Sequence, residues 1–166
     1  MKNDLEIIEY VVNQINSSQI ISDPFPHKFV EKVFPDSFYK ELIGNIPNKD
    51  CYTQINKTGS VSSDYSDERY VFDLLQQNDF NKLKEEQKNF YKILIKVMLS
   101  KDLFKNITLS FKKTIDEQIA KFSENEKERL GWPNFKFYLR TSLIKDYSKY
   151  SLGVHTDNLS KLVTFL

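Results

Sequence analysis

Cysteine is almost absent from this sequence of 166 residues, which contains only Cys51. A single cysteine excludes a disulfide framework and a zinc site built from cysteines. Arginine is also scarce, because only Arg69, Arg129 and Arg140 are arginines among the 24 basic residues. Since arginine is the preferred residue for bidentate contacts to phosphate and guanine, we expect no nucleic-acid partner.

An excess of charge of one sign is absent as well, with 24 basic and 23 acidic side chains and a net charge of +1. This balance provides no general field that would attract nucleic acid or an anionic membrane. Long apolar runs are missing too, since Asp4, Glu6 and Glu9 interrupt the amino-terminal segment. We therefore expect neither a signal peptide nor a membrane-spanning stretch, and we expect a cytoplasmic protein that does not contact membranes.

Large aromatic side chains are plentiful, with 13 Phe, 9 Tyr and 1 Trp. Together with an apolar fraction of 40% they provide enough material for a packed core. The length suits one domain, which we predict over residues 1–166. We divide it into a helix-strand-helix lead-in and loop (1–75), a helical segment (76–131) and a strand-rich end (132–166).

Apolar residues at helical spacing predict a first helix over residues 4–16, with Leu5, Ile8, Val12 and Ile15 on its buried face. A second helix is expected to begin at Asp36 as its N-cap. Further helices are expected after Asp79, as far as Gly131. Apolar alternation or β-rich composition predicts strands over His27–Phe34, Arg69–Leu75, Phe135–Ile144, Tyr150–His155 and Leu162–Leu166. Ser148 and Lys149 are expected to form a turn.

Two further segments of the sequence bear on its function: the polar segment 48–67 and the carboxyl-terminal end. The polar segment Asn48–Asp67 is expected to be a loop, either a variable surface connection or a cover over a substrate. The chain also stops within an apolar run, and a natural domain rarely ends on an unpaired hydrophobic strand. We therefore expect the 166 residues to be the front part of a longer protein.

The residues best suited to chemistry are His155 and Asp157, separated by Thr156. In an extended segment, residues i and i+2 project from the same face, so an imidazole nitrogen and a carboxylate oxygen can bind one metal ion. With a second histidine they would form the 2-His-1-carboxylate triad that binds Fe(II) and leaves positions open. The alternative is a histidine at a strand end whose neighbouring Asp orients its ring or caps a turn.

The sequence around this triplet, LIKDYSKYSLGVHTDNLSKLVTFL over residues 143–166, resembles the first metal-binding region of the Fe(II)/2-oxoglutarate-dependent oxygenases. Residues 24–30, PFPHKFV, and 34–39, FPDSFY, are similar to the lead-in of small bacterial and phage members, which are prolyl-hydroxylase-like. The resemblance covers about 40 of the 166 residues. The central helices show no such resemblance.

The resemblance implies an α+β fold with a double-stranded β-helix (jelly-roll) core, incomplete at its carboxyl end and flanked by amino-terminal and central helices. It implies that His155 and Asp157 bind Fe(II), and that the protein uses 2-oxoglutarate and O2 to hydroxylate a substrate. Tyr147 matches a tyrosine that contacts 2-oxoglutarate in many relatives, although a half-buried strand tyrosine is an equal alternative. Arg140 is a weaker candidate for the same contact, with a solvated strand arginine as its alternative.

The family's second histidine and its downstream Arg or Lys have no match in this sequence. The only other histidine, His27, lies just after Pro26 and is expected to be a structural strand residue. We therefore expect an active dioxygenase in the full-length protein and an inactive 166-residue stretch. Two alternatives stay open: a cupin-like jelly-roll binding domain without metal redox chemistry, and a protein-interaction module that docks through the helices between Phe80 and Phe122. Nothing indicates the substrate or the oligomeric state.

Overall fold

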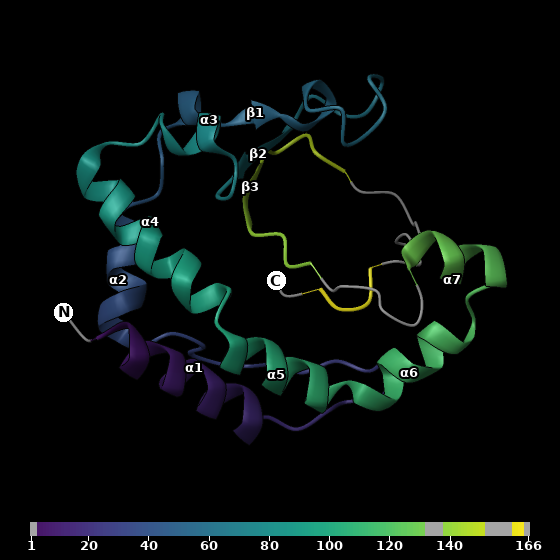
Figure 1. The fold of residues 1–166 in the computed structure, drawn as a ribbon. Coiled ribbons are helices and arrows are strands. Elements are labelled where there is room, and N and C mark those ends of the chain that lie inside the picture. Colours follow the sequence, from purple (N-terminus) through teal and green to yellow (C-terminus); the bar gives the residue numbers. More distant parts are fainter. Residues whose placement is uncertain (1–2, 132–137, 152–160, 165–166) are drawn as a thin grey trace.

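The computed structural model describes residues 3–131, 138–151 and 161–164 of the chain. Most of the regular structure in these ranges is helical, and most of the helices run in an arc along one side of a small sheet (Figure 1). The helices are α1 (Asp4–Ser17), α2 (Asp36–Gly44), α3 (Gln77–Phe80), α4 (Glu85–Met98), α5 (Lys101–Ser110), α6 (Lys112–Ala120) and α7 (Glu124–Leu130), with short 3-10 turns η1 (Lys49–Cys51) and η2 (Ile55–Lys57). The strands are β1 (Thr53–Gln54), β2 (Arg69–Asp73) and β3 (Ser142–Asp146).

The prediction of a jelly-roll core is wrong for the part of the chain that the structure describes. A jelly roll requires about eight strands in two sheets, whereas the described residues form one open sheet in the order β1-β2-β3. The apolar alternation over Phe135–Ile144 indicated an extended chain, but β2 offers a pairing partner for only three residues of it, Ser142, Leu143 and Ile144. The described fold is helical with a small antiparallel sheet.

The sheet joins two segments that lie far apart in the sequence. β2 pairs antiparallel with β3, with Val71 opposite Ile144 at the centre of the ladder. Beyond the ladder, the N–H of Tyr147 donates a hydrogen bond of 3.0 Å to the carbonyl oxygen of Glu68. The predicted strand Arg69–Leu75 is thus confirmed over its first five residues, and its pairing fixes where β3 ends.

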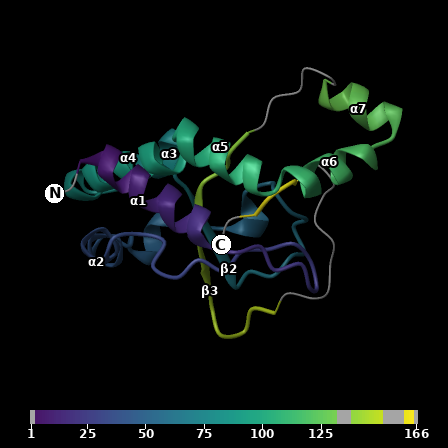
Figure 2. The ribbon, with the colours of Figure 1, turned by 90° about the horizontal axis from the view of Figure 1, so that it is seen from below.

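The helices α1, α4 and α5 lie together on one side of the sheet (Figure 2). The predicted first helix is confirmed as α1, but its buried residues are Ile7, Ile8, Val11 and Ile15, whereas Leu5 is 66% exposed. The core continues into α4 and onto the sheet, where Tyr91 and Phe72 are completely buried. This core fixes β2 against the helical layer and so positions β3.

Helix ends follow ordinary capping rules. The Oδ1 of Asn3 accepts from the N–H of Leu5 at the start of α1, and Ser123 forms a capping box with Glu126 at the start of α7. Gly131 ends α7 with a φ of 79°, a left-handed conformation that glycine adopts without strain. The prediction that Gly131 stops the helices is therefore confirmed.

The lead-in before α2 differs from its predicted form. No strand forms over His27–Phe34; His27 makes an isolated bridge with Ile21, and Phe29 is 72% exposed. Lys32 has a φ of 49°, which breaks an extended run. Asp36 is the first residue of α2, with Pro35 at the N-cap and no capping hydrogen bond from a side chain.

Candidate functional site

The end of β3 brings a set of aromatic and charged side chains to one end of the sheet. Tyr147 directly follows β3 and is half-buried. Its ring packs edge-on against Tyr70, with centroids 5.3 Å apart. The ring of Tyr147 is thus held in place by a residue of β2. This packing is compatible with both interpretations of Tyr147, a structural strand tyrosine and a tyrosine whose hydroxyl contacts a ligand.

Two lysine side chains flank the ring of Tyr147. The Nζ of Lys49 lies 5.0 Å from the centroid of this ring, and the Nζ of Lys145 lies 5.7 Å from it. These distances are within the range of cation–π attraction. The same ammonium groups give this end of the sheet a local positive charge, which suits a carboxylate ligand.

Arg140 lies outside β3, so the predicted strand over Phe135–Ile144 does not extend to it. Its Nε is 3.5 Å from the Oδ2 of Asp73, and its Nη2 is 3.5 Å from the Oγ of Ser60. The side chain is 63% exposed. The structure therefore places Arg140 beside a carboxylate of the protein, near the other end of the β2–β3 ladder from Tyr147.

A second set of contacts lies at the same end of the sheet, on its opposite face. Arg69 donates two hydrogen bonds to Asp146, from Nε to Oδ1 at 2.8 Å and from Nη2 to Oδ2 at 2.7 Å. The guanidinium carbon lies 4.1 Å from the ring centroid of Tyr150. The hydroxyl groups of Tyr150 and Tyr65 are 2.7 Å apart. We call these four residues, Arg69, Asp146, Tyr65 and Tyr150, the anchor cluster.

Within the anchor cluster, the pKa values of Tyr150 and Arg69 are both raised, which keeps both side chains protonated. Burial and the hydrogen bond to Tyr65 raise the pKa of Tyr150 to about 12. The hydrogen bonds to Asp146 raise the pKa of Arg69. At neutral pH the phenol of Tyr150 is therefore protonated and the guanidinium of Arg69 is charged.

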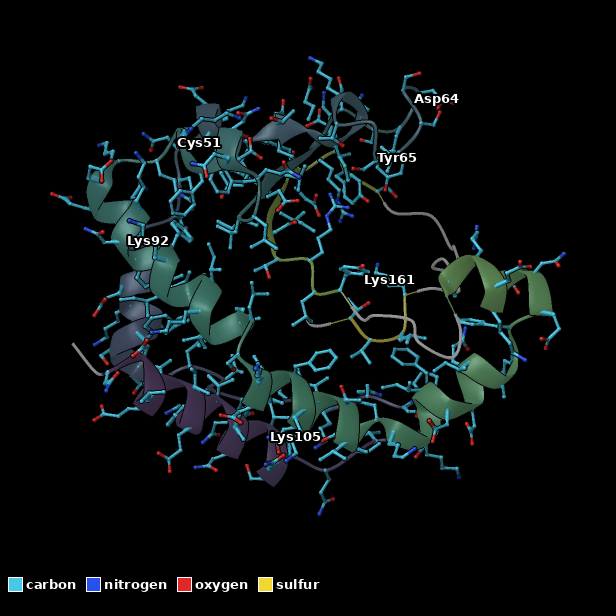
Figure 3. All side chains as sticks on the ribbon, in the orientation of Figure 1. Cys51, Asp64, Tyr65, Lys92, Lys105 and Lys161 are labelled. Atoms are coloured by element: carbon cyan, nitrogen blue, oxygen red, sulfur yellow. The ribbon has the colours of Figure 1, made fainter. Side chains whose placement is uncertain are left out.

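Tyr65 lies in the loop that precedes β2 (Figure 3), and polar contacts hold this loop in place. The Nε2 of Gln54 donates to the carbonyl oxygen of Asp67 at 3.1 Å, and the Nδ2 of Asn56 donates to the carbonyl oxygen of Tyr65 at 3.1 Å. The predicted loop Asn48–Asp67 contains β1 and two helical turns, η1 and η2. Gln54 and Asn56, from the first half of this segment, bind backbone oxygens near its carboxyl end, just before β2.

The metal ligands suggested by the sequence, His155 and Asp157, lie outside the described residues. Among the residues that the structure describes, no group of three or more His, Cys, Asp or Glu side chains could hold a metal ion. His27, the other histidine, has its Nδ1 2.8 Å from the carbonyl oxygen of Phe25. The donor set suggested for iron therefore consists of one imidazole and one carboxylate, which are donor types that suit Fe(II).

Sequence reasoning missed the anchor cluster. Arg69 and Asp146 are 77 positions apart, and Tyr65 and Tyr150 are 85 positions apart. A strand signal was visible at both segments, but nothing in either segment identified the other as its partner. Only the observed register, with Arg69 opposite Asp146, brings the two charges together.

Comparisons of this chain with models of protein families, with curated proteins and with solved structures gave no match. The oxygenase hypothesis therefore depends on the residues of this chain. Separately, none of the helices in the described ranges has the length and apolar character needed to cross a bilayer.

Proposed function

We propose that the protein is an Fe(II)- and 2-oxoglutarate-dependent dioxygenase that hydroxylates an unidentified substrate. The observation that carries this proposal is the triplet His155-Thr156-Asp157 in the sequence, which follows β3, Tyr147 and the turn at residues 147–150. The described residues form one open sheet in place of the expected jelly-roll core, so the triplet, and not the fold, carries the proposal. It assigns two metal ligands within the 166 residues and leaves the third unassigned.

The donor chemistry of the triplet supports iron. A neutral imidazole and a carboxylate are the protein donors of non-haem Fe(II) oxygenases. When bound, Fe(II) and 2-oxoglutarate supply the reaction with O2 that releases succinate and CO2 and hydroxylates a C–H bond. The roles of His155 and Asp157 are to hold the metal; Thr156, on the opposite face of an extended segment, is not assigned to it.

The surroundings of Tyr147 support its role as a 2-oxoglutarate contact. A phenol hydroxyl donates a hydrogen bond to a carboxylate, and the nearby ammonium groups of Lys49 and Lys145 add favourable charge. Arg140 is the weaker candidate, because it would have to exchange its ion pair with Asp73 for the ligand. A reducing, cytoplasmic location suits both Fe(II) and an unpaired Cys51.

The interaction-module alternative receives less support from the helices. The apolar face of α4 is already used within the protein, because Phe90, Tyr91, Leu94 and Val97 are all buried. A partner that docks on the segment from Phe80 to Phe122 would have to use other side chains.

The decisive experiment adds Fe(II) and 2-oxoglutarate to the protein, as its gene encodes it, under anaerobic conditions. We expect a charge-transfer absorption band in the visible range, and we expect His155→Ala to abolish it because a metal ligand is removed. His27→Ala is the matched control, and it should retain the band because the Nδ1 of His27 faces the carbonyl oxygen of Phe25.

Circular dichroism of both variants checks that the fold survives the substitution. A band of equal strength in folded His155→Ala would contradict the ligand assignment. A protein that gives no band and forms no succinate from 2-oxoglutarate in air would instead favour a binding module.

A further inference from the structure

Two lysine and three tyrosine side chains gather at the end of the sheet where β3 finishes. We call these residues, Lys49, Lys145, Tyr52, Tyr70 and Tyr147, the lysine–tyrosine cluster. The Nζ of Lys49 lies 5.0 Å from the ring centroid of Tyr147 and 5.6 Å from that of Tyr70. The Nζ of Lys145 lies 5.7 Å from the centroid of Tyr147 and 6.0 Å from that of Tyr52. Two ammonium groups therefore share three aromatic rings.

Three separate segments of backbone position these side chains. In the ladder, Lys145 of β3 stands opposite Tyr70 of β2. The η1 turn carries Lys49, and the N–H of Tyr52 closes this turn with a hydrogen bond of 3.0 Å to the carbonyl oxygen of Lys49. Tyr52 is buried, and its ring centroid lies 5.8 Å from that of Phe72 in the core. The rings are thus held by the ladder and the core, so the ammonium groups lie over an ordered surface.

Neither ammonium group has a carboxylate partner among the residues that the structure describes, where the ion pairs involve other basic side chains. Asp146, the neighbour of Lys145, is bound by Arg69 on the opposite face of the sheet. A ring face attracts the charge of an ammonium group but provides no oxygen acceptor for its three N–H donors. Because Lys49 is exposed and Lys145 is half-buried, both can offer these donors to a ligand from solvent.

The distances from Tyr147 limit the size of such a ligand. Both Nζ atoms lie near the same ring, so they are no farther apart than the sum of the two distances, about 11 Å, which one small anion with two charges can bridge. Ammonium groups bind phosphate and carboxylate oxygens through short, charge-assisted hydrogen bonds. A single dianion would also balance the two positive charges.

We propose that the lysine–tyrosine cluster is an anion site that binds one small dianion, a phosphate or a dicarboxylate, between Lys49 and Lys145 without a metal ion. The site shares Tyr147 with the proposed function but goes beyond it, because it requires neither iron nor the triplet at His155. The bound oxygens contact the two ammonium groups, and the rings hold these groups in place.

The test titrates inorganic phosphate, and separately succinate, into the isotope-labelled full chain at low ionic strength with EDTA present. Two-dimensional NMR follows the backbone amide signals. We expect saturable shifts at Lys49, Tyr70 and Lys145 that fit one bound anion per chain. Because the site is partly exposed, half-saturation is expected near about 1 mM. Raising the ionic strength to about 1 M should weaken binding at least about 5-fold, because salt screens the ammonium charges.

Substitution of either lysine tests the site directly. Lys49→Met and Lys145→Met each remove one charge but keep an apolar stem on the rings, so each should raise the dissociation constant at least about 3-fold. Lys105→Met is the matched control and should leave it unchanged, because Lys105 lies on α5, away from the strands (Figure 3). Circular dichroism checks the fold of each variant. If Lys145→Met fails to fold, Lys49→Met on the exposed turn still decides the result.

The two anions distinguish the sources of the ligand: tighter binding of phosphate identifies a phosphoryl group, and tighter binding of succinate identifies a dicarboxylate. Shifts that do not saturate with either anion overturn the inference, as does equal affinity in the unaltered protein and folded Lys49→Met. The Fe(II) absorption band tests the proposed function separately. A band without metal-free anion binding overturns only this inference, whereas saturable anion binding without a band overturns only the proposed function.

Discussion

Tyr91 is the largest side chain that is fully buried among the described residues. Its ring packs edge-on against Phe90, with centroids 5.4 Å apart, and also faces Phe72 of β2. Its hydroxyl donates a hydrogen bond of 3.1 Å to the carbonyl oxygen of Asn45. One residue thus joins α4, the sheet and the end of α2, and its polar atom has a partner in the core.

We predict that Tyr91→Phe lowers the free energy of unfolding at neutral pH by about 1 kcal/mol, because a buried hydrogen bond is lost. Burial raises the pKa of Tyr91 above the unfolded value of about 10. The stability that depends on the protonated phenol is therefore complete below pH 10, and it is lost as the pH rises further. Urea unfolding across this range should show a shallower alkaline decline in Tyr91→Phe than in the unaltered protein.

Tyr39→Phe is the control for this prediction, because Tyr39 is 53% exposed. Its unfolding free energy should differ from that of the unaltered protein by less than about 0.5 kcal/mol. An alkaline decline of the same steepness in Tyr91→Phe and the unaltered protein would show that Tyr91 is not the titrating group.

At the candidate site, sequence reasoning identified single residues but not their partners. Tyr147 was selected from its place before the His-x-Asp triplet, and the structure adds Tyr70, Lys49 and Lys145 around it. These neighbours come from β2, η1 and β3, and no local pattern links them. Side-chain identity is local information, whereas a site is assembled by tertiary contacts.

At the scale of elements, helices were easier to predict than the faces they bury. α1 has apolar residues on more than one side, at Leu5, Ile7, Ile8, Val11 and Val12, so the helical period alone did not select the buried face. Contact with α4 and α5 decides it. The predicted strand over 27–34 failed for the complementary reason, because an extended segment without a partner strand gains no ladder hydrogen bonds.

The start of α5 offers a test of element stability. The Oγ of Ser100 accepts a hydrogen bond of 3.2 Å from the N–H of Leu103, a residue that is buried against α1 and α4. We predict that Ser100→Ala lowers the free energy of unfolding by about 1 kcal/mol, because an N–H at the helix start loses its acceptor. Chemical denaturation measures this loss.

Ser63→Ala, in the exposed loop before β2, is the same substitution without a cap to remove. Its unfolding free energy should stay within about 0.5 kcal/mol of the unaltered value. If both variants lose the same amount, the cap does not contribute to stability.

At the scale of the whole molecule, the described residues form two separate apolar clusters. The larger one joins α1, α4 and the sheet, whereas the smaller one consists of Ile115, Ile119 and Phe122 with a few neighbours. Three buried residues protect far less surface from water than the fourteen of the larger cluster. Stability should therefore be unequal along the helical layer.

We predict that backbone amides of α6 exchange with deuterium faster than those of α4 by at least about 10-fold, because α6 opens locally without global unfolding. Native-state hydrogen exchange followed by mass spectrometry or NMR measures this difference. Ile119→Ala should accelerate exchange in α6 and leave α4 nearly unchanged. Equal acceleration in both helices would mean that the two clusters unfold as one unit.

The packing of α1 also sets an order of events during synthesis. The Nδ2 of Asn16 donates to the Oδ1 of Asn106, a contact that spans 90 positions of sequence. A ribosome adding about 5–20 residues per second takes roughly 5–20 s to cover that interval. Until α4 and α5 have both been synthesised, the apolar side of α1 lacks helices that cover it, so nascent chains are expected to recruit a chaperone at this stage and to release it once α5 emerges.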